Sequence, residues 1–381
     1  MKICIIGTGP AGLMAGYQLL KRGMEVQFYD QKKVAGRKFL VAGNGGFNLT
    51  HSKKLDEFIP NYNHIKIQQA VLEFNNHATI QWLQEIGIPT FVGSSGKIFP
   101  QKGIKPIEVL DAWLTKIEGL GGTFHFEHRF IDWGESFAQF EVKNQNVTVY
   151  YDKIIFGLGG ASWKKTGSDG GWTTAFVKNG IQLIPFQASN AGMNSESVTK
   201  ELEGLILKNC RVTLGSESIL GEVLFTAYGL EGSPIYALND SFRRGHKKLK
   251  IHLKPCVDNR QILDVLSNTE LNRSQQLKKL KIPSAVINLF KSKLTKEEYL
   301  SNQHLLEIIT SLTFNIQSLR PIDEAISSVG GVSMNDVNDS FKLVHHSNHY
   351  AIGEMLDWDA PTGGYLLQAC FSMGAKVAKS I

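Results

Sequence analysis

The order of apolar and polar positions predicts that the chain begins as an α/β protein. Residues 2–6 form a short apolar run, and a glycine-rich turn separates them from a helical stretch that begins near Pro10. A second apolar run over residues 25–29 ends at Asp30. A strand, a tight turn, a helix and a second strand in this order are typical of the opening of a doubly wound parallel sheet.

The following segments change their hydrophobic period. Apolar residues recur at mostly helical spacing over 65–89 and 107–120, which predicts one helix in each range. Alternation over 123–126, 140–143 and 147–150 then predicts a small antiparallel meander.

The pattern changes again near residue 187. Short β-like runs dominate residues 187–260, and lysine-rich helical stretches dominate residues 261–318. In residues 319–381 the β-like runs return and a closing helix follows. This order predicts a discontinuous first domain, made of residues 1–186 and 319–381, that an inserted module interrupts.

Composition narrows the class of protein. A chain of 381 residues with 42% apolar and 20% charged residues is long enough for two or three soluble globular domains. No apolar run approaches membrane-spanning length, and glycines interrupt the first one, so we expect a strand there and no secretory signal. Four cysteines without a C-x-x-C pair favour a reduced cytosolic compartment over a redox-active dithiol or a zinc site. The net charge of +6 is only a weak indication of a polyanionic partner.

A glycine motif in the first turn predicts a dinucleotide site. Three glycines match the spacing G-x-G-x-x-G, and an acid stands 18 residues after the last of them. The first glycine permits the tight bend, the second admits a pyrophosphate, and the third lets the helix pack on its strand. The helix N-terminus offers N–H groups to the phosphates, and the acid accepts hydrogen bonds from the adenosine ribose. The residues that we assign to this site are Gly7, Gly9, Pro10, Ala11, Gly12, Asp30 and Gln31.

Three later segments favour FAD over NAD. Arg37 and Lys38 place cationic donors beside the phosphates, and a buried strand over 153–161 brings the bare backbone of Gly159 close to a flat or phosphorylated group. A carboxylate at a strand end can hold a ribityl hydroxyl. A helix that starts after two glycines can direct N–H groups at the pyrimidine edge of a flavin. The contacts that we predict in this last segment are Gly353, Glu354, Gly363, Gly364, Tyr365 and Leu366.

Six segments carry motifs with a family resemblance, namely 36–50, 159–162, 166–170, 221–230, 330–333 and 353–357. They resemble the bacterial BaiN/HI0933-like family of NAD(P)/FAD-dependent oxidoreductase flavoproteins, which includes a bile-acid Δ4,6-reductase, an aminoacetone oxidase and a ribosomal RNA dihydrouridine synthase. The resemblance covers nearly the full chain. It implies a Rossmann-like FAD-binding domain that carries an inserted β-barrel-like module, 187–260, and a small helical module, 261–318.

The chain departs from the main pattern of that family in three places. Residues 46–48 read Gly-Phe-Asn where much of the family has Arg-Cys-Asn, Ala227 replaces a common His, and Leu366 replaces an Asn. The chain is similar to a less studied branch with the pattern Ala-Gly-x-Gly-Gly-x-Asn-Leu-Thr-His at residues 42–51. The match in this segment implies two further cofactor contacts, Gly45 and Asn48.

The sequence offers two candidate acids or bases for flavin chemistry. Tyr228 lies in a matched segment and can donate a proton, and Glu324 is the second candidate, with Arg320 as a possible clamp for an anionic group. Each also has a structural interpretation, as a packed ring or a charge at a helix start. A second G-x-G-x-x-G after a strand is missing from the sequence, so we expect NAD(P)H to act as a transient reductant at the flavin itself.

The interpretation that we favour is a cytoplasmic, FAD-dependent and NAD(P)H-dependent reductase of an activated double bond in a small molecule. The alternatives are a flavin-dependent ribosomal RNA dihydrouridine synthase, an amine oxidase and a non-catalytic flavoprotein redox sensor. The basic stretch 243–254 leaves an RNA partner open, although its alternation is typical of a half-buried strand with a solvated cationic face. We expect no metal site, because the cluster of His345, His346 and His349 favours a solvated turn.

Overall fold

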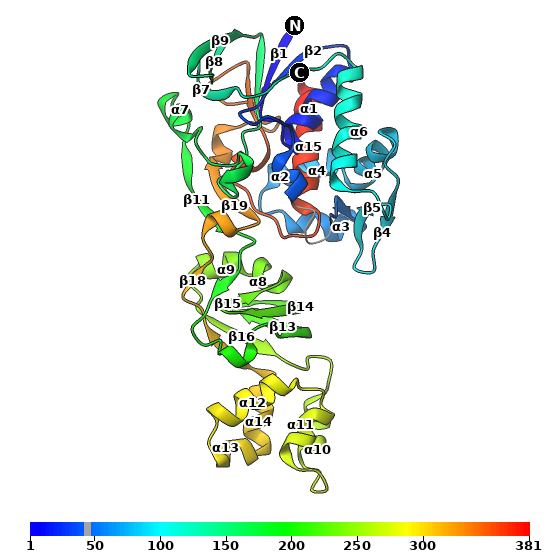
Figure 1. Cartoon of the computed structure of the whole chain (residues 1–381), viewed down its shortest axis with the longest axis vertical. Coiled ribbons are helices and arrows are strands. Elements are labelled where there is room, and N and C mark those ends of the chain that lie inside the picture. The colour runs from blue at the N-terminus through cyan, green and yellow to red at the C-terminus, as the bar shows by residue number, and fades with distance from the viewer. Residues whose placement is uncertain (42–46) are drawn as a thin grey trace. The chain divides into compact units, whose positions relative to one another are not determined.

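The computed structural model describes residues 1–41 and 47–381 and divides the chain into two compact units (Figure 1). The first unit contains Met1–Gln187 and Ile326–Ile381, and the second contains Ala188–Ala325. The chain therefore leaves the first unit and later returns to it. Residues 319–325 belong to the second unit.

A five-stranded parallel sheet forms the centre of the first unit. Its strand order is β20-β10-β1-β2-β6, so strands from both ends of the chain share one sheet. Each neighbouring pair is parallel. The predicted α/β fold with a Rossmann-like parallel sheet is therefore confirmed. The strands are β1 (Lys2–Ile6), β2 (Glu25–Tyr29), β6 (Thr123–His125), β10 (Lys153–Phe156) and β20 (His349–Ala351).

Helix α1 (Pro10–Lys21) begins at the glycine turn and packs along α15 (Tyr365–Ser380), which closes the chain (Figure 1). Pro10 stands in the first turn of α1, where its missing N–H leaves no hydrogen bond unmade. Gly374 lets the two helices approach closely, because a Cβ there would lie 2.5 Å from the carbonyl O of Ala11. The first and last helices of the chain thus share one core.

Three smaller sheets complete the first unit, in the orders β3-β5-β4, β7-β8-β9 and β11-β19. The prediction that residues 123–126 begin the antiparallel meander is wrong. Residues 123–125 form β6, which pairs in parallel with β2, and Phe124 stacks on Phe28 with ring centroids 4.7 Å apart. Alternation marks a strand but not the partner with which it pairs, so the local pattern assigned these residues to the wrong sheet. The meander is β7 (Arg129–Trp133), β8 (Phe137–Val142) and β9 (Gln145–Tyr150). The other strands are β3 (Thr50–His51), β4 (Thr90–Val92), β5 (Lys97–Pro100), β11 (Leu183–Ser189) and β19 (Ser327–Val332).

The single helix predicted over 65–89 is in fact two helices, α4 (Ile65–Glu73) and α5 (Asn76–Glu85). The Oδ1 of Asn75 accepts hydrogen bonds from the backbone N of His77 and Ala78, at 3.0 and 3.1 Å. Such an N-cap starts a new helix at this point. The helix predicted over 107–120 is confirmed as α6. The remaining helices are α2 (Arg37–Val41), α3 (Leu55–Phe58), α6 (Pro106–Gly119) and α7 (Thr173–Lys178).

A seven-stranded antiparallel sheet forms the second unit's framework, in the order β17-β16-β13-β14-β15-β12-β18. The helical stretch lies in sequence between β16 and β17, so strands from both sides of it join the same sheet. These strands are β12 (Met193–Asn194), β13 (Ile206–Leu214), β14 (Glu217–Thr226), β15 (Gly229–Glu231), β16 (Lys248–His252), β17 (Leu312–Asn315) and β18 (Ser318–Leu319).

The basic strand β16 is half-buried, as its alternation predicted. Leu249 and Ile251 are buried, while Lys248 and Lys250 are exposed. The helices of this unit are α8 (Ser233–Ala237), α9 (Asn239–Arg243), α10 (Asn259–Leu266), α11 (Arg273–Lys279), α12 (Ser284–Lys293), α13 (Lys296–Leu300) and α14 (Asn302–Thr310). Across residues 1–41 and 47–381, no helix has both the length and the apolar character that a membrane crossing requires.

Candidate functional site

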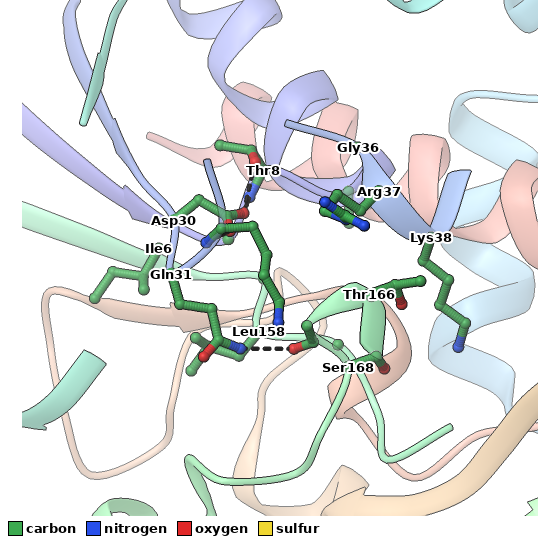
Figure 2. A pocket seen from close by; sticks show the side chains of 18 of the residues that line it. Ile6, Thr8, Asp30, Gln31, Gly36, Arg37, Lys38, Leu158, Thr166 and Ser168 are labelled. Atoms are coloured by element: carbon green, nitrogen blue, oxygen red, sulfur yellow. Dashed lines mark hydrogen bonds between the residues drawn. The ribbon is translucent and has the colours of Figure 1, made fainter. Parts of the chain in front are cut away.

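A pocket opens at the carboxyl ends of the strands in the parallel sheet (Figure 2). Residues that come just after β1, β2, β10 and β20 line it, namely Gly7, Asp30, Gly157 and Gly353. Strand β1 pairs with β2 on one side and with β10 on the other, so the strand order reverses here. Open α/β sheets bind ligands at such a switch point.

The glycine turn combines tight packing with one open position. Gly7 has a φ of +100°, and a Cβ there would lie 2.2 Å from the carbonyl O of Gly157. A Cβ at Gly12 would lie 2.2 Å from the carbonyl O of Gly7. Gly9 differs, because a Cβ there would meet no atom within 4 Å. Gly9 lines the pocket directly before α1, so its bare backbone leaves room for a phosphate at the N-terminus of that helix.

Asp30 holds the glycine turn in shape. Its Oδ2 accepts hydrogen bonds from the backbone N and the hydroxyl of Thr8, at 2.9 and 2.6 Å (Figure 2). Its Oδ1 accepts one from the backbone N of Lys32 at 2.8 Å. A carboxylate offers about four acceptor positions, so Oδ1 retains capacity for a ribose hydroxyl. Gln31 and Thr8 also line the pocket. Thr8 was not predicted from the sequence, because the motif fixes only its glycines and a lone hydroxyl gives no further signal.

Lys38 lies on the opposite side of the pocket from Asp30 (Figure 2), and its ammonium forms an ion pair with Glu354. The Nζ of Lys38 is 2.6 Å from Oε2 of Glu354 and 2.6 Å from Oγ of Ser162. The Oε1 of Glu354 accepts a further hydrogen bond from the backbone N of Ser328 at 2.9 Å. The ammonium of Lys38 is therefore committed to Glu354, whereas the exposed side chain of Arg37 lines the pocket.

The turn after β10 completes the wall. Gly159 has a φ of +75°, and its carbonyl O accepts a hydrogen bond from Nε1 of Trp172 at 3.0 Å. Ser168, Asp169 and Trp172 line the pocket as well. They were not among the predicted site residues, although the motif over 166–170 was the signal that could have found two of them.

Several predicted cofactor residues lie outside this lining set. Gly12 packs behind the turn, and a Cβ at Gly364 would lie 2.6 Å from the backbone of Thr50. Tyr365 stacks on Phe58, with ring centroids 4.7 Å apart, and burial raises the pKa of Tyr365 to about 12. Gly45 lies outside the described residues. The predicted residues that the structure places beyond the pocket lining are Gly12, Asn48, Gly363, Gly364, Tyr365 and Leu366.

The two candidate acids, Tyr228 and Glu324, belong to the second unit. The hydroxyl of Tyr228 donates to Oε1 of Glu231, and burial together with Glu231 raises the pKa of Tyr228 well above its ordinary value. Glu324 is exposed and accepts from Nε of Arg320 at 2.7 Å. The guanidinium of Arg320 lies 4.1 Å from the ring centroid of Tyr228. The structure thus brings both candidates into one cluster around Arg320.

The histidine cluster is not the solvated turn that we predicted. His349 is only 1% exposed, and its Nε2 lies 2.9 Å from the hydroxyl of Tyr151 and 3.0 Å from the carbonyl O of Gly134. The prediction failed because β20 carries His349 into the sheet, while His345 stays exposed. Burial lowers the pKa of His349 to about 4. The described residues contain no group of three side chains that could hold a metal ion.

A protein-family comparison adds to this geometry. The family described as HI0933-like protein Rossmann domain matches residues 1–380. The chain belongs to this HI0933-like family. The match spans both units of the structure, and the Rossmann domain in the family description agrees with the parallel sheet and its switch-point pocket.

Curated relatives resemble this HI0933-like chain over nearly their whole length. A protein of Haemophilus influenzae named ribosomal RNA dihydrouridine synthase is 24% identical over 99% of this chain and 97% of its own. A protein of Clostridium scindens named 3-dehydro-bile acid delta(4,6)-reductase is 24% identical over 98% of this chain and 97% of its own.

Solved structures agree in fold. A 3-ketosteroid-delta4-(5alpha)-dehydrogenase of Rhodococcus jostii has a TM-score of 0.53 at 11% identity, over 99% of this chain and 96% of that one. A flavocytochrome c3 fumarate reductase has a TM-score of 0.54 at 11% identity, over 99% of this chain and 78% of that one. At such low identity these likenesses concern the fold alone.

Proposed function

We propose that this HI0933-like chain binds FAD in the switch-point pocket. The observation that carries the proposal is the open position at Gly9, beside the N-terminus of α1 and the exposed guanidinium of Arg37. Free N–H groups, a helix dipole and a bidentate cation together suit a pyrophosphate. The spare capacity of Asp30 suits a ribose hydroxyl, and Lys38 holds Glu354 where it can accept from a second hydroxyl group.

We propose further that the chain is an oxidoreductase that reduces an activated carbon–carbon double bond in a small molecule. When bound, FAD supplies the hydride, and NAD(P)H is the donor that we propose for its reduction. The names of the curated relatives support this class, because one is a delta(4,6)-reductase and making dihydrouridine saturates a double bond conjugated to a carbonyl group. Tyr228 is our candidate for the proton that must accompany the hydride.

A uridine in RNA is the second candidate substrate. The relatives from Haemophilus influenzae and from Escherichia coli both carry the name ribosomal RNA dihydrouridine synthase. The exposed Lys248 and Lys250 on β16 offer cations that phosphates can contact. The small molecule stays first because the alternation in β16 is also what a solvated strand face requires.

Anaerobic spectroscopy of the purified protein tests both the binding of FAD and the proposed reductase activity. Protein that carries FAD should lose its flavin absorbance when NADPH or NADH is added. Reoxidation by 2-methyl-2-cyclohexen-1-one would support the small-molecule reductase, and reoxidation by unmodified ribosomal RNA, with loss of uridine, would support the second candidate.

Three outcomes would contradict the proposal at different levels. Protein that neither carries nor takes up FAD would remove the cofactor assignment. Hydrogen peroxide formed with amines, and without NAD(P)H, would indicate an amine oxidase instead. Bound FAD that no donor and no acceptor turns over would favour a redox sensor.

A further inference from the structure

A short loop after β10 forms one wall of the switch-point pocket and is bonded to the turn after β2. Residues 166–169 of this loop, which we name the strap, line the pocket, and so does Gln31, which directly follows Asp30. The Nε2 of Gln31 donates to the carbonyl O of Gly167 at 2.8 Å and to Oδ2 of Asp169 at 3.3 Å (Figure 2). Gln31 therefore joins two walls of the pocket that come from segments 136 residues apart.

Two of the three polar side chains in the strap have partners within the protein. The hydroxyl of Thr166 donates to the carbonyl O of Trp163 at 2.8 Å. The Oδ1 of Asp169 accepts a hydrogen bond from the backbone N of Gly171 at 2.9 Å. The third side chain, Ser168, is buried, and its hydroxyl has no hydrogen-bond partner among the described residues.

The position of Ser168 relates this hydroxyl to the pocket. A Cβ at Gly159 would lie 3.2 Å from Oγ of Ser168, and both residues line the pocket. A buried hydroxyl without a partner opposes folding, so the strap holds Ser168 in place at a cost in free energy. A ligand in the pocket can remove that cost, because phosphate and ribose oxygens accept hydrogen bonds from a hydroxyl. The bonds from Gln31 place the strap at the side of the pocket where Asp30 can receive the adenosine ribose.

We propose that Ser168 is a binding residue for the adenosine diphosphate half of FAD, and that Gln31 is a positioning residue that holds the strap in place. The hydroxyl of Ser168 donates to a phosphate or ribose oxygen of the bound cofactor. The inference rests on the proposed binding of FAD and deepens it, because nothing above gives Ser168 a role. The amide of Gln31 is committed to the strap and acts through Ser168.

Removal of the Ser168 hydroxyl should change stability and affinity in different ways. Ser168→Ala removes an unpaired buried group, so the apoprotein should melt at or slightly above the parent temperature. Its affinities for FAD and for ADP should each fall about tenfold, because the bound ligand loses a hydrogen bond in a buried site. Ser372→Ala is the matched control. The hydroxyl of Ser372 is also buried but donates to the carbonyl O of Phe74 at 2.6 Å, so this variant should melt lower and bind both ligands as the parent does.

A double-mutant cycle tests whether Gln31 acts through Ser168. Gln31→Met keeps an unbranched side chain but removes the amide, and it should also weaken the binding of FAD and ADP about tenfold. Adding Ser168→Ala to Gln31→Met should weaken binding by no more than about twofold further, because the strap no longer holds the hydroxyl. Gln68→Met is the control and should leave both affinities unchanged, since Nε2 of Gln68 donates to the carbonyl O of Tyr62 at 2.7 Å and Gln68 is not part of the pocket lining.

Calorimetric titration of each apoprotein with FAD and with ADP measures the affinities, and calorimetric melting without ligand measures stability. Unchanged affinities in Ser168→Ala, or a loss for FAD alone, would overturn the binding role. A fall in melting temperature as large as that of Ser372→Ala would show that the Ser168 hydroxyl is bonded within the protein, which also contradicts that role. Additive losses in the cycle would overturn the positioning role of Gln31.

The two ligands keep this inference apart from the proposed function. A parent protein that binds ADP but not FAD refutes the proposed cofactor, and the ADP titrations then still decide the roles of Ser168 and Gln31. A parent protein that binds neither ligand removes the cofactor and both roles together.

Discussion

The two ends of the parallel sheet in the first unit are built in opposite ways. At the carboxyl ends of the strands, glycine turns and charged side chains leave an open pocket, and Gly9 has room for a Cβ that no neighbour would touch. At the other end, Trp133, Tyr151 and His346 pack around the buried imidazole of His349. The sheet thus separates an end that can admit a polar ligand from an end that excludes water.

The difference follows from how parallel strands are connected. The carboxyl ends of all five strands point the same way, so the turns that follow them lie at one end of the sheet. Glycines keep parts of those turns free of side chains. The opposite end of the sheet contacts the β7-β8-β9 meander. Gly134 directly follows β7 and Tyr151 directly follows β9. Glycine turns therefore leave one end open between polar side chains, whereas interlocking side chains fill the other end.

The largest expected effect is the loss of FAD binding when a side chain is added to the glycine turn, and it distinguishes Gly9 from Gly12. Gly9→Val should fold with nearly the parent melting temperature but lose FAD, with affinity reduced by more than about a hundredfold, because only the cofactor would fill the space that the side chain takes. Gly12→Val should lose FAD and also about 3 kcal/mol of folding stability, because its Cβ would meet the carbonyl O of Gly7 at 2.2 Å. Flavin absorbance and thermal unfolding measure the two quantities. Stoichiometric FAD in folded Gly9→Val would place the cofactor elsewhere.

The buried imidazole at the opposite end of the sheet should make the folding stability fall on acidification. The pKa of His349 is about 4 in the folded chain, against an ordinary value near 6.5, because burial disfavours the cation. The unfolded chain therefore binds more protons between pH 6.5 and pH 4, and stability falls as the pH is lowered through this window. The full loss amounts to about 3 kcal/mol below pH 4.

Urea unfolding at pH 4.5 and pH 7 measures most of that loss. His349→Phe should flatten the difference between the two pH values, whereas His345→Phe, at an exposed position nearby, should leave it in place. The titratable and polar groups that face His349 are His346, Tyr151 and the carbonyl O of Gly134. Equal pH dependence in both variants would show that His349 does not control this end of the sheet.

The same contrast explains what could be predicted from the sequence. The glycine turn, Asp30 and the strands around them depend on local spacing, and the structure places Gly7, Gly9 and Asp30 around one pocket. His349 looked solvated because its partner Tyr151 lies almost two hundred residues earlier. The helical spacing of apolar residues also continues across the break between α4 and α5, so it did not reveal that break. There the side chain of Asn75 caps the N-terminus of α5, and a new helix begins. Contacts between side chains of distant segments leave no signal in the local sequence pattern.

The ion pair in the pocket should matter more than one at the surface. Lys38→Met leaves the carboxylate of Glu354, only 17% exposed, without its cation, and we expect FAD to bind about tenfold more weakly, which corresponds to about 1.4 kcal/mol. The matched control is Lys21→Met, because Lys21 forms an ion pair of equal length, 2.6 Å, with Glu85 at the surface, where such pairs contribute little. Titration of the apoprotein with FAD measures both. Equal affinities would mean that Glu354 does not need its partner to receive the cofactor.

The smallest expected effect concerns the third turn of the pocket, where the indole N–H of Trp172 donates to the carbonyl O of Gly159 at 3.0 Å. Trp172→Phe should cost about 1 kcal/mol more folding stability than Trp82→Phe. Both changes remove the same atoms from a buried indole, but Nε1 of Trp82 has no hydrogen-bond partner among the described residues. Urea unfolding of the two variants isolates the hydrogen bond. If they lose stability equally, the turn at Gly159 is held by its backbone alone, unlike the glycine turn after β1, where the carboxylate of Asp30 accepts two hydrogen bonds from Thr8.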